Sequence, residues 1–134
     1  GRYRGGLGVD VVARFTLDAK VRNRMTRLKC PPWGLEGGLE GATNASVVIE
    51  DGGEVSLSRG SDYSLPVGRC IRVLTGGGGG YGNPYERPVQ QVVDDVIDGY
   101  ISRATAERDY GLVFQANGKV DEQATQKRRA KGRK

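Results

Sequence analysis

The residues best suited to bring a ligand close to the backbone lie in one run of glycines. Five glycines follow Thr75, and Tyr81 and Gly82 come next. Glycine loses more conformational freedom on folding than any other residue, so a folded chain keeps such a run only where side chains must be absent. We expect positive φ angles there, and either backbone packed directly on backbone or a ligand held very close.

The nucleotide-binding motifs that glycines commonly build are not supported in this run. The spacing Gly77-x-Gly79-x-x-Gly82 has the form of a dinucleotide fingerprint, but Pro84 and Pro88 separate it from the next expected helix. A dinucleotide loop opens directly into its helix. No Gly-Lys-Ser or Gly-Lys-Thr occurs either, so we expect this segment to bind no cofactor. The candidates for substrate or interface contacts are Gly76, Gly77, Gly78, Gly79, Gly80, Tyr81, Gly82, Glu86, Arg87 and Trp33.

Charged side chains near the glycines could serve chemistry or only stabilise the fold. Glu86 and Arg87 form either an ion pair that pins the loop or a contact with substrate. Asp94, Asp95 and Asp98 could supply paired carboxylates, yet Asp94 and Asp98 share a helix face opposite a row of valines. A solvated helix surface has the same pattern, and this is the interpretation that we favour for the three aspartates.

Few other side chains could do chemistry. Histidine is absent, which removes the commonest metal ligand and general base. Cys30 and Cys70 lack the paired spacing of a zinc or redox site, so we expect two reduced thiols and no metal. Trp33 lies in a loop of prolines and glycines, where it either plugs the loop onto the core or lines an interface or substrate cleft. No nucleophile stands beside a base, so no catalytic residue is assigned.

An ordered set of motifs spans nearly the whole chain. It comprises Gly1-Arg2-Tyr3-Arg4-Gly5-Gly6-Leu7-Gly8, Pro31-Pro32-Trp33-Gly34-Leu35, Gly77-Gly78-Gly79-Gly80-Tyr81-Gly82-Asn83-Pro84 and Arg108-Asp109-Tyr110-Gly111. In this order the set resembles the C-terminal end of the hydantoinase B/oxoprolinase family. Members of that family are long B subunits or B-like halves of fused enzymes. The resemblance therefore implies that these 134 residues represent only a C-terminal portion of such a protein.

The resemblance also implies a function for the complete assembly. This function is ATP-dependent opening of a cyclic amide, such as a hydantoin or 5-oxoproline, with ATP and a divalent metal held elsewhere in the assembly. The implied partners are a hydantoinase A-type subunit and the missing upstream part of the B subunit, where the family's catalytic positions lie. Related members carboxylate ketones, which is one alternative. On this basis the isolated chain is expected to be inactive, with a structural and interface role.

Hydrophobic spacing predicts the elements that position these residues. Strands are expected over residues 9–17 and 21–28, joined as a hairpin, then over 45–50, 54–58 and 69–75. About five short strands with hairpin turns favour an antiparallel arrangement and an α+β fold. The sequence thus predicts a β-rich part over residues 1–75 and a glycine loop over 76–88.

After the loop, the hydrophobic period becomes helical. Residues 89–111 are expected to form an amphipathic helix that ends at Gly99 and a short helix between Ser102 and Gly111. A strand over 112–115 and a basic helix that begins after Asp121 follow. We expect one α+β domain over residues 1–120 and a basic tail over 121–134 that frays.

Composition and charge limit the remaining function classes. The 134 residues suit a single domain with a modest core, since 37% are hydrophobic and 7% aromatic. Both ends of the chain are basic and the middle is acidic, and the basic tail has no aromatic residue. A basic nucleic-acid-binding module is thus the less favoured alternative. Neither a leader sequence nor an apolar run of ~20 residues is present, so we expect a cytoplasmic location and no membrane.

Overall fold

The computed structural model describes residues 1–132, which fall into two compact units. The sheet unit contains Gly5–Gly34 and Glu40–Gly79, and the helical unit contains Gly1–Arg4, Leu35–Leu39 and the chain from Gly80 onward. Each unit therefore collects stretches that are far apart in the sequence. The single domain expected over residues 1–120 stays a prediction, and a measurement of whether those residues unfold together would test it.

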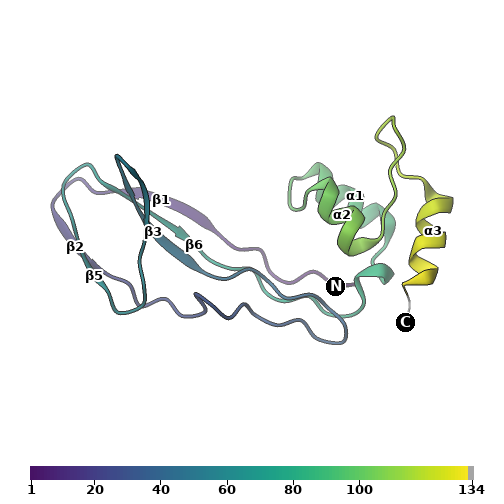
Figure 1. The fold of residues 1–134 in the computed structure, drawn as a ribbon, viewed down its shortest axis with the longest axis horizontal. Helices are drawn as coiled ribbons and strands as arrows, with labels where there is room; N and C mark the ends of the chain where they lie inside the picture. Colours follow the sequence, from purple (N-terminus) through teal and green to yellow (C-terminus); the bar gives the residue numbers. More distant parts are fainter. Residues whose placement is uncertain (133–134) are drawn as a thin grey trace. The chain divides into compact units, whose positions relative to one another are not determined.

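The sheet unit holds two antiparallel sheets (Figure 1). The larger has the strand order β1-β6-β3-β4, and the smaller pairs β2 with β5. The bounds are β1 Asp10–Arg14, β2 Ala19–Arg22, β3 Ala45–Glu50, β4 Gly53–Ser56, β5 Asp62–Leu65 and β6 Cys70–Leu74. The α+β class and the antiparallel pairing predicted from the sequence are confirmed, with six strands in place of about five.

One predicted hairpin forms and another does not. β3 and β4 pair as expected, with Val48 opposite Val55. The expected hairpin between the first two strands is wrong, because β1 pairs with β6 and β2 pairs with β5. Alternation of apolar residues shows which face of a strand is buried, but it carries no information about the partner strand. The missed strand β5 provides the partner that β2 uses.

Apolar side chains from both sheets share one small core. Val48, Leu57, Leu65 and Ile71 are buried, and Phe15, Val21, Tyr63 and Val73 pack against them. Burial of this kind contributes roughly 1.5–3 kcal/mol for each large side chain that is fully removed from water. β1 takes little part in it, because all five of its residues are exposed.

The helical unit contains a 3-10 turn, η1 (Pro84–Glu86), and the helices α1 (Val89–Ile97), α2 (Arg103–Tyr110) and α3 (Glu122–Lys131) (Figure 1). The predicted caps are present, since Ser102 accepts a hydrogen bond from Thr105 N and Gly111 has a φ of 68°. The predicted strand over 112–115 is reduced to one bridge between Phe114 and Val120. Too few residues on each side of the turn pair there to form a ladder.

The core of the helical unit brings the three helices together. Val92, Ala106, Tyr110 and Leu112 are buried, and partly buried apolar residues surround them. α3 joins through Thr125, which is fully buried and accepts a hydrogen bond from Val113 N at 3.0 Å. Whether the basic tail expected over residues 121–134 frays stays a prediction, and residues 133–134 lie outside the described part. No helix within residues 1–132 combines the length and apolar character needed to cross a bilayer.

Candidate functional site

Backbone packs directly on backbone along the glycine run of the sheet unit. A Cβ atom on Gly77 would lie 2.7 Å from the Gly6 carbonyl oxygen, and real Cβ atoms essentially never come within 3.0 Å of such an atom. A Cβ on Gly79 would overlap the Trp33 carbonyl group, and a Cβ on Gly76 would overlap that of Ala42. The close approach expected at these glycines is therefore made by the chain itself.

The run continues in the helical unit with the same packing. Gly80 N donates to Leu39 O, and Leu35 N donates to Gly80 O, both at 2.9 Å. Tyr81 forms bridges with Tyr3 and with Leu35. Here too the segments are held by main-chain hydrogen bonds, which require close contact between backbones.

The backbone angles correct one expectation about these glycines. None of Gly76 to Gly80 has a positive φ, whereas Gly82 has a φ of 75°. A Cβ on Gly76, Gly77, Gly79 or Gly80 would come within 3.0 Å of neighbouring backbone, whereas one on Gly78 would lie 3.2 Å from Gly6 N. Within this run, only Gly82 uses the left-handed region that other residues avoid. A run of glycines in a sequence does not distinguish these two causes.

Trp33 does not plug its loop onto the core. Its side chain is 71% exposed, and the Arg27 guanidinium lies 5.7 Å from the ring centroid. An exposed Trp of this kind is what the interface alternative requires. The contact that would cover it remains a proposal.

Glu86 and Arg87 do not pair with each other as one interpretation expected. Arg87 Nη2 lies 2.9 Å from Asp95 Oδ2, and Glu86 Oε2 lies 3.6 Å from Arg2 Nη1. Neighbouring residues in this turn point in different directions: Arg87 is 8% exposed, whereas Glu86 is exposed. Arg87 also donates to the Arg2 carbonyl oxygen at 3.2 Å.

Asp95 is the residue that the sequence interpretation missed. The sequence predicts a solvated helix face for Asp95, but the residue is only 5% exposed. Arg87 lies beside its Oδ2 atom, and Arg4 donates a hydrogen bond to its Oδ1 atom. The guanidinium of Arg4 also lies 4.5 Å from the Tyr100 ring centroid. The spacing could have indicated this burial. Asp95 follows the buried Val92 by three residues, so the two share one face of the helix. A buried carboxylate between two arginines is a structural anchor for residues 1–4.

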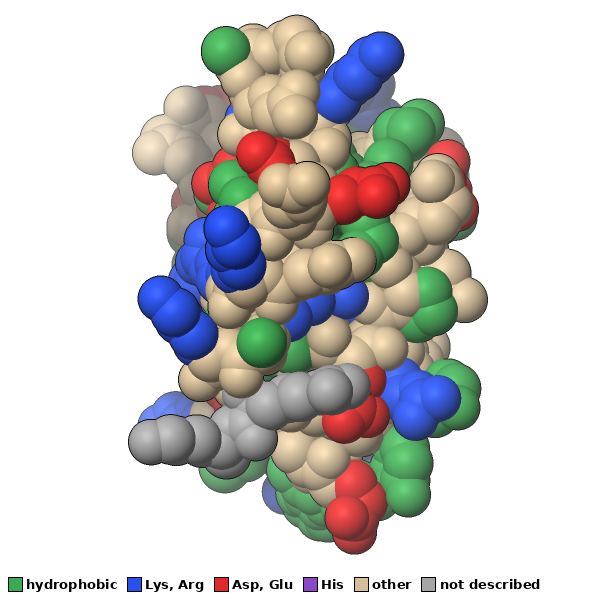
Figure 2. All heavy atoms as spheres, turned by 90° about the vertical axis from the view of Figure 1, so that its right-hand side faces the viewer, with side chains coloured by type: hydrophobic (Ala, Val, Ile, Leu, Met, Phe, Trp, Pro, Cys, Tyr) green, Lys and Arg blue, Asp and Glu red, His purple; other side chains and the backbone are tan. Residues whose placement is uncertain are grey.

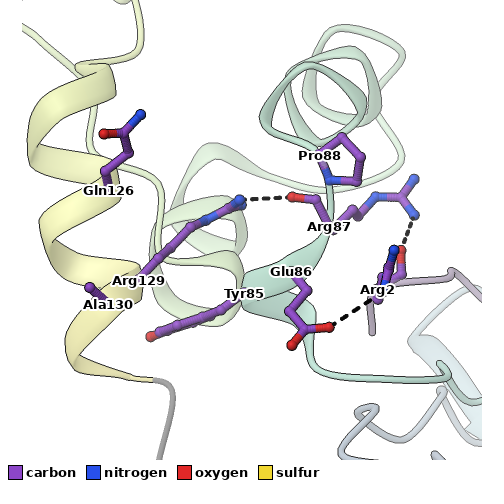
Figure 3. A pocket seen from close by; sticks show the side chains of 8 residues that line it. All are labelled: Arg2, Tyr85, Glu86, Arg87, Pro88, Gln126, Arg129 and Ala130. Carbon is purple, nitrogen blue, oxygen red and sulfur yellow. Dashed lines mark hydrogen bonds and ion pairs between the residues drawn. The ribbon is translucent and has the colours of Figure 1, made fainter.

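A cavity of about 550 Å³ lies beside α3 and is lined by charged and aromatic residues. The lining residues are Arg2, Tyr85, Glu86, Arg87, Pro88, Gln126, Arg129 and Ala130. Figure 3 shows the Arg129 side chain reaching from α3 to the backbone of Arg87. Arg129 Nη1 donates to Arg87 O at 2.7 Å, and its Nε donates to Tyr110 O at 2.9 Å. Burial lowers the pKa of Arg129 below its usual value.

The charged side chains that the structure describes around this cavity are arranged to hold backbone segments in place, and they do not form a recognisable catalytic or metal-binding group. Within residues 1–132, no group of three or more Cys, Asp or Glu side chains is placed to hold a metal ion. Cys30 is exposed, Cys70 is partly buried, and neither forms a disulfide. The charged groups that converge here are arginines bound to carbonyl groups or carboxylates, which position segments but do not pair a nucleophile with a base.

Comparison with known proteins now gives the family. The family profile described as Hydantoinase B/oxoprolinase matches residues 1–84. An uncharacterized protein of Methanocaldococcus jannaschii is 41% identical over 110 residues, which are 82% of this chain and 20% of that protein. A protein of Pseudomonas sp. provisionally described as the B subunit of a D-/L-hydantoinase is 30% identical over 129 residues, which are 93% of this chain and 22% of that protein.

Two solved structures have a similar fold. The ATP-dependent caprolactamase from Pseudomonas jessenii matches with a TM-score of 0.80 and 28% identity, over 97% of this chain and 24% of that one. The nucleotide-free acetone carboxylase matches with a TM-score of 0.57 and 22% identity, over 75% of this chain and 18% of that one, which shows the fold alone. The chain spans about a fifth of the length of the curated relatives. It belongs to the hydantoinase B/oxoprolinase family.

Proposed function

We propose that this chain is a structural and interface portion of one component of an ATP-dependent cyclic-amide hydrolase. The observation that carries the proposal is the structural similarity to a caprolactamase over 97% of this chain. That caprolactamase is named as ATP-dependent. Each unit has its own core and its own anchored glycine segment, which suits a structural role. Catalytic groups, ATP and a divalent metal would then belong to other parts of the assembly, with an A-type subunit as partner.

The interface role rests on surfaces that carry large apolar side chains. Trp33 in the sheet unit and Tyr81 in the helical unit are 71% and 52% exposed, and both belong to glycine segments whose backbones are closely packed. Closely packed backbone that displays aromatic side chains suits a recognition surface, because aromatic side chains supply large contact areas at a small cost in conformational entropy. These residues therefore remain interface candidates, together with Glu86 at the cavity.

The charge distribution gives less support to a nucleic-acid-binding module. Figure 2 shows the face that carries α3, where Lys and Arg side chains lie among Asp and Glu side chains. Electrostatic attraction of phosphates is strongest where positive charge gathers on one face. The similarity to acetone carboxylase concerns the fold alone, so ketone carboxylation remains the second enzymatic alternative without an observation that favours it.

A chimera tests the proposed function. This chain would replace the aligned segment of the Pseudomonas sp. relative, and the product would be assayed with its A-type subunit for ATP hydrolysis that depends on a hydantoin, 5-oxoproline or caprolactam. We expect turnover by the chimera and none by the 134-residue chain alone. Turnover by the isolated chain, or a chimera that responds only to acetone and bicarbonate, would contradict the proposal.

A further inference from the structure

Strand β1 ends the larger sheet with an unusual concentration of exposed apolar residues. Val9, Val11 and Val12 are 56%, 49% and 56% exposed, and Leu7 and Leu17 on either side are 53% and 75% exposed. β1 stands at one end of the strand order, so its outer edge has no partner strand within the described residues. An apolar strand at the edge of a sheet offers free main-chain donors and acceptors to another strand.

The register of β1 shows that the core face of the sheet continues onto it. Val11 lies opposite Val73 and Ala13 lies opposite Ile71. Ile71 is buried in the core of the sheet unit, and Val73 packs against that core. Because residues opposite one another share a face, Val11 and Ala13 extend this apolar face outward, and both are exposed.

The opposite face of β1 is also partly apolar. Val12 lies there with Asp10 and Arg14, opposite Arg72 of β6. Arg72 pairs with Asp10 at 2.6 Å and with Glu54 at 3.4 Å, which leaves Val12 beside a neutralised patch. A charged edge would discourage strand addition, but Asp10 is paired with Arg72, and Arg14 is the only other charged residue of β1.

We propose that a β-strand from the remaining part of a hydantoinase B-type protein adds to the outer edge of β1 and completes this sheet. The lengths of the relatives support this source for the added strand. The segments that match this chain make up only 20% and 22% of two relatives, so most of each relative lies outside the matched segment. The added strand places apolar side chains beside Val11 and Ala13 and so extends the core. This inference rests on the proposed function, because the added strand would be the partner that contacts the proposed interface.

Hydrogen exchange tests the added strand directly. The backbone amides of Asp10–Arg14 would be compared between the 134-residue chain and the chimera with the Pseudomonas sp. relative, with β4 at the other edge as an internal control. We expect exchange in β1 to slow by about tenfold or more in the chimera, since amides that gain partners become protected. β4 should change much less. Equal exchange of β1 in both proteins would overturn the proposal.

A pair of variants separates docking from general destabilisation. Val11→Asp should weaken the protection of β1 in the chimera, whereas Val67→Asp, at a residue that is 61% exposed outside the strands, should not. A chimera that hydrolyses cyclic amides while β1 stays unprotected would refute the added strand and leave the proposed function standing. Protection of β1 in the chain alone that rises with protein concentration would assign the edge to a second copy and also overturn the proposal.

Discussion

One arginine–aspartate pair from each unit shows the same kinds of charged residue in opposite environments. In the sheet unit, Arg22 and Asp62 lie on the surface, with side chains 55% and 57% exposed. In the helical unit, Asp95 and Arg87 have side chains 7% and 9% exposed. Surface pairs are screened by water and contribute little, but a buried group that loses its partner is left with an uncompensated charge. Burial, and not residue type, therefore decides how much each pair matters.

The largest effect is expected from Asp95→Asn. This change leaves Arg87 buried without its counter-charge, which should destabilise the protein by about 3–5 kcal/mol in urea unfolding. Asp94→Asn is the matched control, because Asp94 is exposed and its carboxylate accepts a hydrogen bond from Gln90. Asp94→Asn should stay within about 0.5 kcal/mol. Equal effects from both changes would remove the contrast between the two environments.

The sheet unit should be most sensitive where backbone is packed on backbone. In Gly79→Ala, the new methyl group meets the Trp33 carbonyl, and we expect a loss of about 3 kcal/mol, at the upper end for overpacking. Gly6→Ala provides the control, since a Cβ there meets nothing within 4 Å and no positive φ is involved. Urea unfolding of both variants makes the comparison. A neutral Gly79→Ala would mean that the glycine segments are loosely packed.

A smaller loss is expected when α3 is loosened. Thr125→Val keeps the shape of the side chain but removes the acceptor for Val113 N, which should cost about 1–2 kcal/mol in thermal or urea unfolding. Thr125→Ser retains the hydroxyl and should preserve more of the stability. If neither variant changes the melting temperature, α3 contributes little to the helical unit, and the tail frays as its sequence suggested.

The smallest effect should come from the exposed pair in the sheet unit, and it should depend on pH. The hydrogen bond from Arg22 lowers the pKa of Asp62 below its usual 3.8. A carboxylate with a lowered pKa stabilises the fold above the unfolded pKa and loses that contribution as pH falls through the folded pKa. Asp62→Asn should therefore lower the melting temperature slightly at pH 7, and the difference should shrink as pH falls below 3.8. Asp98→Asn, at another exposed position, is the matched control substitution.

The sequence alone determined the class of the fold and much of its local structure. Alternation and helical spacing predicted the antiparallel strands, α1 and α2, because each depends on residues near one another in the chain. The caps at Ser102, Gly111 and Asp121 were readable for the same reason. The ordered motifs indicated the family, although no single motif would have done so.

Only the tertiary structure decided which distant segments meet. The pairing of β1 with β6, the burial of Asp95 between Arg4 and Arg87, and the packing of the Gly6 backbone on Gly77 all join residues more than fifty positions apart or on separate elements. Alternation, spacing and composition describe neighbours along the chain, whereas burial depends on what the rest of the fold places alongside. For this reason the three aspartates Asp94, Asp95 and Asp98 have the sequence pattern of a solvated helix face, although Asp95 is buried in the helical unit.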